Sequence, residues 1–374
     1  MSKLEREASL KALLQLSNLA KFKAFNETID PRSGLAPTKV DIAAYQFLDL
    51  ASPAQPRDVQ VPRSLIELDP EVDDWETPRC EALLTTSDGT KKKDIVDRVR
   101  KLACLLNHSP KPEAFRTPHC LGFFDKADPD TPDEDVDIID RRLGLIFERP
   151  HDDQLHASLP PVSLHDLLRD TSVRKPRVTE RVQLAHALSN CVLYLHAVNW
   201  LHKGLRSHNV LFFRARGGGG VDYSRPYLSG FDFSRPGGAD EMTDAPGDDA
   251  EHDLYRHPRT QSNRRGGKNG DKEEERERSK KSFDVYSLGV VLVELAHWRT
   301  VDEVLAIDMR RARGDKEVVR RMGEKYEEAT RACLAGGEAL GLREGDDETD
   351  DEVAERLSMR YYEDVVKKLG SIVV

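Results

Sequence analysis

The pattern of hydrophobic and polar positions predicts helices near both ends of the chain and a mixed region between them. Leucine and phenylalanine recur at near-helical spacing over residues 4–28, and Pro31 and Gly34 end that segment. A further amphipathic helix is expected between Asp94 and Asn107, because its leucine, valine and isoleucine side chains share one face.

The central part of the chain combines strand and helix patterns. Residues 141–150, RRLGLIFERP, are typical of a buried strand that ends at proline. A short helix is expected over 163–169 and a long helix over 177–200. Two short strands, 210–213 and 227–231, flank a glycine-rich turn.

The C-terminal part is predicted to be mainly helical. A strongly hydrophobic helix is expected over 284–298, and an acidic loop at 344–352 interrupts the helices that follow. The longest strongly apolar run, Leu288–Ala296, includes Glu294 and is far shorter than the ~20 residues that span a bilayer. We therefore expect no membrane-spanning segment.

Three polar segments are expected to lie outside the folded core. Residues 51–63 contain three prolines and predict an extended linker. Residues 125–140 contain eight acidic residues but lack the ligand spacing and turn glycine of a calcium loop, which favours a solvated hairpin loop. Residues 236–282 are rich in Gly, Asp, Lys, Arg and Glu and are predicted to be disordered, with Tyr255–Pro258 as a locally tethered exception.

Together these patterns predict an α+β protein with three parts. Residues 1–60 form a helical segment and linker, and residues 61–150 form a small mixed unit. Residues 151–374 form a mainly helical unit that contains the disordered insert.

Composition narrows the classes of protein. The chain of 374 residues is 38% hydrophobic, enough for a sizeable core, and its net charge of −10 argues against general binding to nucleic acid or anionic membranes. Its five scattered cysteines form no CxxC pair, so we expect neither a disulfide framework nor a zinc site. The charged N-terminal sequence lacks the apolar core of a signal peptide. These features predict a cytoplasmic, intracellular protein.

Residues 202–211 carry the first of several motifs that resemble protein kinases. They read HKGLRSHNVL, follow the long predicted helix and lead into a strand, as does the kinase catalytic loop H-R-D-L-x-x-x-N. Residues 228–235, LSGFDFSR, resemble the strand and turn that carry D-F-G. Tyr255 and Pro258 lie where kinases end the activation segment, and residues 282–292, SFDVYSLGVVL, resemble the buried helix that follows.

The order of these motifs implies a two-lobed protein-kinase-like fold, with a small mixed N-lobe at 61–150 and a mainly helical C-lobe at 151–374. Residues 143–149 then occupy the hinge strand. The sequence further resembles fungal kinase-like regions that often follow a HeLo-type helical domain, whose tail the helix at 4–28 would then form.

The resemblance implies a degenerate active site. The catalytic-loop aspartate that accepts a proton corresponds to Gly204, and the aspartate that opens D-F-G corresponds to Gly230. Arg206 replaces the catalytic-loop lysine, whereas Asn209 is retained. Lys203 stands in the place of the arginine of H-R-D.

The register of the second motif has two alternatives. In the preferred register the motif is Gly230-Phe231-Asp232, with Leu228 in the apolar strand position. In the shifted register it is Asp232-Phe233-Ser234, and Asp232 would be available for a metal ion. The catalytic base is missing in both.

The nucleotide-binding features of kinases are also sparse. Gly89 is the only glycine between Leu35 and Leu121, whereas a phosphate-binding loop needs several. Residues Lys91–Lys93 are better interpreted as a solvated hairpin or helix start than as the nucleotide lysine. The resemblance therefore allows ATP and magnesium but does not require them, and no metal site is expected.

Other matching positions have structural roles in the resemblance. Asp284 corresponds to the carboxylate that accepts backbone N–H bonds from the catalytic loop, and His202 to the histidine packed beneath it. Our interpretation is a pseudokinase that signals by binding protein partners. The alternatives are an atypical active serine/threonine kinase that uses Asp232, and an adaptor that works through its N-terminal helix.

Overall fold

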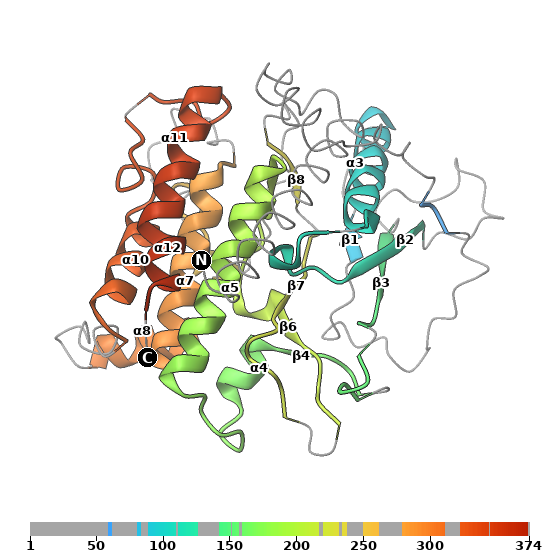
Figure 1. Cartoon of the computed structure of the whole chain (residues 1–374). Coiled ribbons are helices and arrows are strands. Elements are labelled where there is room, and N and C mark those ends of the chain that lie inside the picture. Colours follow the sequence, from blue (N-terminus) through green and yellow to red (C-terminus); the bar gives the residue numbers. More distant parts are fainter. Residues whose placement is uncertain are drawn as a thin grey trace, which may run out of the picture. The chain divides into compact units, whose positions relative to one another are not determined.

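Short antiparallel sheets and a larger set of helices give the chain a mixed α+β fold in the computed structural model (Figure 1). The structure describes residues 59–61, 81–83, 89–109, 111–125, 142–150, 152–156, 159–216, 220–231, 234–237, 250–261, 279–310, 322–343 and 345–372.

The chain divides into two compact units. The first comprises residues 1–151 with the short segments 197–200 and 229–239, and the remaining residues form the second unit. The first boundary lies next to the one expected at 150/151. The two short segments that return to the first unit were not anticipated.

The first unit contains a three-stranded antiparallel sheet. Its order is β1 (Glu81–Leu83), β3 (Arg142–Glu148) and β2 (His119–Asp125), with α3 (Gly89–Asn107) packed against β2. The buried residues of α3 include Val99, Leu102, Ala103, Leu105 and Leu106. This helix begins before the expected Asp94, and the lysines at 91–93 therefore belong to a helix start. A 3-10 turn, η2 (Glu113–Phe115), precedes β2.

Two further small sheets involve short strands. The second unit pairs β4 (Val162–Ser163), β6 (Val210–Phe212) and β7 (Tyr227–Leu228) in the order β4-β6-β7. The expected strands over 210–213 and 227–231 are thus confirmed, although the second is shorter. The remaining pair joins β5 (Trp200–Leu201) to β8 (Arg235–Pro236).

Helices make up most of the second unit. In chain order they are α4 (Leu164–Arg169), α5 (Val178–Ala197), η4 (Ser207–Asn209), α6 (Ala250–Asp253), η5 (Pro258–Thr260), α7 (Lys281–His297), α8 (Val301–Arg310), α10 (Glu324–Ala335), α11 (Asp351–Tyr361), the π-turn η7 (Tyr362–Val366) and α12 (Lys367–Gly370).

Polar bonds between neighbouring helices fix their packing in the second unit. The hydroxyl of Tyr326 on α10 donates to the carbonyl of Leu292 on α7 at 2.8 Å. The Arg181 guanidinium on α5 donates to the carbonyls of Leu295 and Ala296, at 3.2 and 2.7 Å. These carbonyls lie in the last turn of α7, where a cation complements the helix dipole.

Gly289 on α7 permits a close approach to α10. A β-carbon at this position would lie 2.9 Å from Cβ of Cys333 and 3.0 Å from the Leu334 side chain. We expect Gly289→Val to lower the free energy of unfolding by about 1–3 kcal/mol, because it overfills this contact. Thermal and urea denaturation measure the effect. Gly220→Val is the control, since nothing lies within 4 Å of a β-carbon there, and equal losses in both variants would contradict the packing argument.

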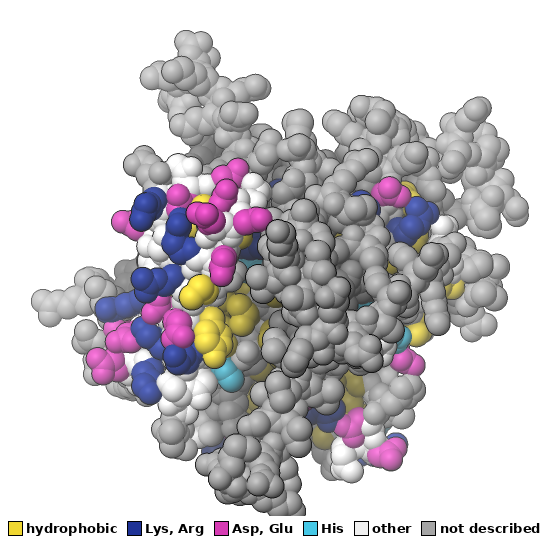
Figure 2. All heavy atoms as spheres, turned by 45° about the horizontal axis from the view of Figure 1, so that its top comes forward, with side chains coloured by type: hydrophobic (Ala, Val, Ile, Leu, Met, Phe, Trp, Pro, Cys, Tyr) yellow, Lys and Arg dark blue, Asp and Glu magenta, His cyan; other side chains and the backbone are white. Residues whose placement is uncertain are grey.

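The surface of the C-terminal helices carries interspersed charges. Figure 2 shows basic and acidic side chains side by side on this face, next to a small hydrophobic patch. Lys367 pairs with Glu363 one turn away, at 2.6 Å, and Lys368 joins α12 to Glu328 on α10 at 3.0 Å. Met359 and Tyr362 are exposed at the end of α11 and the start of η7.

Several expected segments lie outside the described residues. They are the helix over 4–28, nearly all of the 51–63 linker and the acidic 125–140 loop, and most of the 236–282 insert. Within that insert, residues 250–261 form α6 and η5, so the expected disorder does not extend to them. None of the helices in the described part of the chain has the length and hydrophobicity to cross a membrane.

Candidate functional site

The loop that follows β5 is anchored by a buried carboxylate from α7. Asp284 is 3% exposed and accepts the backbone N–H of His202 at 2.7 Å and that of Lys203 at 2.8 Å. Its Oδ2 also lies 3.2 Å from Nε2 of His196 on α5. One side chain therefore connects two helices of the second unit to the loop.

The electrostatics of Asp284 favour the ionised form. Burial alone would raise the pKa of its carboxyl group, but the bond to His196, the neighbouring His202 ring and the backbone N–H together hold that pKa below its usual value. Because a carboxylate can only accept, the His196 Nε2 carries the proton in this contact. Asp284 thus acts as a fixed acceptor.

Short hydrogen bonds determine the shape of the anchored loop. Lys203 adopts a left-handed backbone conformation with φ of 63°, which is uncommon for a residue with a side chain. The buried His202 accepts the N–H of Gly204 through Nδ1 at 3.2 Å. The Asn209 side chain donates to the Gly204 carbonyl at 2.6 Å and so closes the loop across η4. Arg206 is half-buried at the start of η4.

The second sequence motif lies in the first unit. Gly230 has a φ of 73°, a backbone conformation that favours glycine, and Phe231 is buried with 1% exposure. Asp232 and Phe233 lie outside the described residues. The choice between the two registers therefore stays open.

A second buried network lies behind the anchored loop. Glu294 on α7 accepts the hydroxyl of Tyr255 at 2.6 Å, the hydroxyl of Ser207 at 3.3 Å and the N–H of Val301 at 3.0 Å. Ser287 donates to the Tyr255 carbonyl at 2.8 Å. Tyr255 is thereby fixed to α7 by both its side chain and its backbone.

Glu294 has an unusual environment for an acid. It is fully buried, and its Oε2 atom has no hydrogen-bond partner among the described residues. Burial raises the pKa of Glu294 to about 8, although the bonds from Tyr255, Val301 and Ser207 oppose that rise. This shift favours the protonated form of the side chain near neutral pH.

Pro258 lies at the start of a short 3-10 helix. It is exposed and begins η5, directly after His257. Proline fits the first position of a helical turn because it needs no N–H partner there.

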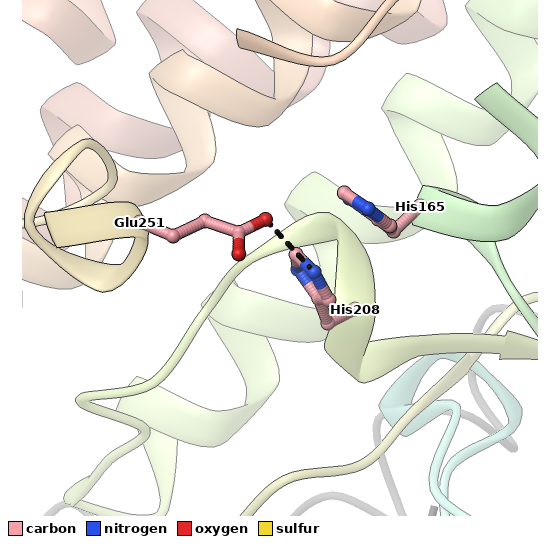
Figure 3. Close-up of side chains that lie close together, drawn as sticks. All are labelled: His165, His208 and Glu251. Carbon is pink, nitrogen blue, oxygen red and sulfur yellow. Dashed lines mark ion pairs between the residues drawn. The ribbon is translucent and has the colours of Figure 1, made fainter. Parts of the chain in front are cut away.

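Three side chains from separate elements of the second unit meet near the loop. Figure 3 shows His165 of α4, His208 of η4 and Glu251 of α6 turned toward one another. Nε2 of His208 lies 3.2 Å from Oε1 of Glu251, and the two imidazole rings stack at 3.7 Å. One potential ligand atom from each residue lies within 4.8 Å of the other two.

Sequence reasoning missed both the Glu294 network and this cluster. Glu294 offered a signal, since an isolated acid within an apolar helix is rarely buried without partners. The cluster offered none, because its members are far apart in the sequence and share no ligand spacing. Only the tertiary structure brings them together.

Comparison with known proteins identifies one family. The family described as Domain of unknown function (DUF7580) matches residues 135–373. No curated protein matches the chain. The match covers the whole second unit apart from its last residue, including the anchored loop, the Glu294 network and the histidine cluster. The chain therefore belongs to the DUF7580 family.

Proposed function

We propose that this chain is a degenerate member of the protein-kinase-like superfamily, with a two-lobed fold, that acts by binding protein partners. The observation that carries the proposal is the anchored loop. Its backbone is held by Asp284 and closed by Asn209, yet the position expected to carry the catalytic carboxylate is Gly204.

The absence of a side chain at Gly204 removes proton acceptance from the loop. In phosphoryl transfer, a carboxylate at this position orients the substrate hydroxyl and takes up its proton. Positioned general bases contribute roughly 10²–10⁴-fold to such reactions. The Asn209 amide cannot replace that carboxylate, because its Nδ2 donates to Gly204 rather than accepting a proton.

The metal-binding position is affected in the same way. In the preferred register, Gly230 stands where a carboxylate would hold the magnesium ions, and a glycine has no ligand atom in its side chain. Metal ions supply several kcal/mol of charge stabilisation to such transition states. Loss of either carboxylate is expected to make turnover too slow for signalling by catalysis.

The anchored loop and its neighbouring helices keep a fixed arrangement that suits a binding protein. The loop, α6 and η5 are held to α7 through Asp284, Glu294 and Tyr255, and together they offer a fixed surface to a partner. We propose that protein partners recognise this surface and that the kinase-like fold supplies rigidity. ATP and magnesium are not required for this role.

Phosphotransfer is the direct test. Purified full-length protein incubated with γ-labelled ATP and both magnesium and manganese is expected to label neither itself nor generic protein substrates above background. The variant Asn209→Ala/Asp232→Ala controls for contaminating kinases. Stoichiometric labelling that this variant abolishes would contradict the pseudokinase proposal and favour an atypical serine/threonine kinase.

Nucleotide binding is a separate measurement. Thermal-shift titrations with ATP, with and without magnesium, determine whether a nucleotide still stabilises the fold, since a ligand that binds only the native state raises the melting temperature. The paired variant Gly204→Asp/Gly230→Asp is expected to restore little phosphotransfer, because a glycine-rich phosphate loop and a lysine–glutamate pair are not recognisable in the sequence.

A further inference from the structure

The cluster of His165, His208 and Glu251 has the composition of a transition-metal site. Two imidazole nitrogens and one carboxylate oxygen form a common protein ligand set for zinc, which leaves a fourth tetrahedral position for water or another ligand. We propose that these three residues bind one Zn²⁺ ion in the second unit. This proposal does not depend on the kinase-like interpretation.

The distances suit such an ion. Zinc bonds of about 2.0–2.1 Å in a tetrahedron place the ligand atoms roughly 3.3 Å apart. Nε2 of His208 and Oε1 of Glu251 already lie 3.2 Å apart. All three potential ligand atoms lie within 4.8 Å of one another, so His165 must move closer and the rings must reorient to complete the set.

His165 supplies a second, independent observation. This residue is 7% exposed, and its Nδ1 atom has no hydrogen-bond partner in the described part of the chain. A buried polar atom without a partner is unfavourable, and metal coordination satisfies it.

A zinc ion can reach the cluster from solvent, but the two stacked imidazole rings must change their orientation to bind it. The Glu251 side chain is 49% exposed and that of His208 is 25% exposed, so an ion can enter from solvent between them. The two rings are inclined by only 22°. A metal ion lies in the plane of each imidazole that binds it, so the rings must open from this stacked arrangement on binding.

Such an ion would join three elements of the second unit. It would connect α4 to η4 and to α6, the short helix that precedes Tyr255. Residues 209–250 separate His208 from Glu251 along the chain, so the ion would tie α6 to η4 across this intervening segment. Binding is therefore expected to raise the stability of this part of the chain.

Zinc titration of the chelator-treated full-length protein tests the site. Isothermal titration calorimetry is expected to show one equivalent of Zn²⁺ per chain, and Co²⁺ in place of zinc should give the visible spectrum of a tetrahedral nitrogen and oxygen site. Affinity should fall as the solution is acidified, because a metal ion binds imidazoles only in their neutral form.

Two variants distinguish a built site from surface binding. Glu251→Gln removes one ligand at an exposed position, and His165→Phe removes another while keeping a ring against His208. Removing a residue that only hydrogen-bonds to a metal ligand lowers metal affinity about 10–100-fold. Removing a ligand itself should therefore weaken zinc binding by about 100-fold or more in each variant. Glu355→Gln, an exposed carboxylate on α11, is the control and should bind as the wild type does.

The outcomes separate clearly. Saturable binding of one equivalent that Glu251→Gln and His165→Phe both weaken, with Glu355→Gln unchanged, supports the site. No saturable zinc binding by the wild type would overturn it. Equal binding by the wild type and Glu251→Gln would also overturn it, and that comparison holds even where His165→Phe fails to fold.

Discussion

Asp284→Ala is expected to lower the free energy of unfolding by about 3–5 kcal/mol. The substitution leaves the buried N–H of His202 and the half-buried N–H of Lys203 without their acceptor, and an unsatisfied buried donor costs about 1–3 kcal/mol. It also removes the contact with His196. Lys203 loses the bond that helps to hold its left-handed backbone conformation.

Urea denaturation followed by circular dichroism measures this loss. Glu355→Ala, at an exposed position on α11, is the control and should change stability by less than about 0.5 kcal/mol. Asp284→Asn should give an intermediate loss, because one amide oxygen can replace only part of the pattern that uses both carboxylate oxygens. Wild-type stability in Asp284→Ala would exclude the anchoring role.

Acid should weaken the same anchor. The pKa of Asp284 is lower in the folded chain than in the unfolded chain, so its contribution is present above the usual aspartate pKa and is lost as pH falls through the lower folded value. Asp284→Asn lacks this titration. The difference in stability between the wild type and Asp284→Asn should therefore shrink as the solution is acidified.

The helical core could be predicted from the sequence because burial leaves a strong local pattern. The helices α4, α5 and α7 lie within a few residues of the expected positions. The predicted ends of these helices are less accurate, because the backbone conformation of single residues determines where a helix stops. The expected helix over 177–200 ends at Ala197, because Asn199 turns to a φ of 56° and Trp200 enters β5.

Part of the site could also be predicted from the sequence. The resemblance predicted that Asp284 accepts backbone N–H groups of the loop. Its bonds to His202 and Lys203 confirm this. The bond from Asn209 to Gly204 stays within the same loop motif. The first contact joins the catalytic-loop motif to the motif around Asp284, and the second lies within the catalytic-loop motif, so both follow from the resemblance.

The histidine cluster shows why the rest could not be predicted. His165, His208 and Glu251 belong to three elements that carry different local signals, and none of those signals concerns metal binding. Their proximity depends on how α4, η4 and α6 pack. Without the tertiary structure, each residue is an ordinary polar side chain.

Glu294→Gln is expected to change how stability depends on pH. The folded chain raises the pKa of Glu294 from 4.5 to about 8, so the folded state holds a proton that the unfolded state releases between these values. The contribution of this group is therefore fully present below about pH 4.5 and is lost as pH rises through about 8. Glutamine stays neutral, and its oxygen can still accept the bonds from Tyr255, Ser207 and Val301.

Parallel denaturation of the two proteins from about pH 5 to about pH 9 measures the difference. At the acidic end Glu294→Gln should be less stable than the wild type, because its amide N–H groups take the place of Oε2, for which the described residues offer no partner. As pH rises, the wild type should lose several kcal/mol relative to the variant, since a tenfold difference in proton affinity between the folded and unfolded chain corresponds to about 1.4 kcal/mol. Glu355→Gln corrects for the loss of one acidic side chain. Parallel profiles for wild type and Glu294→Gln would show that the buried acid is ionised throughout, with its charge compensated by the Tyr255 and Ser207 hydroxyls.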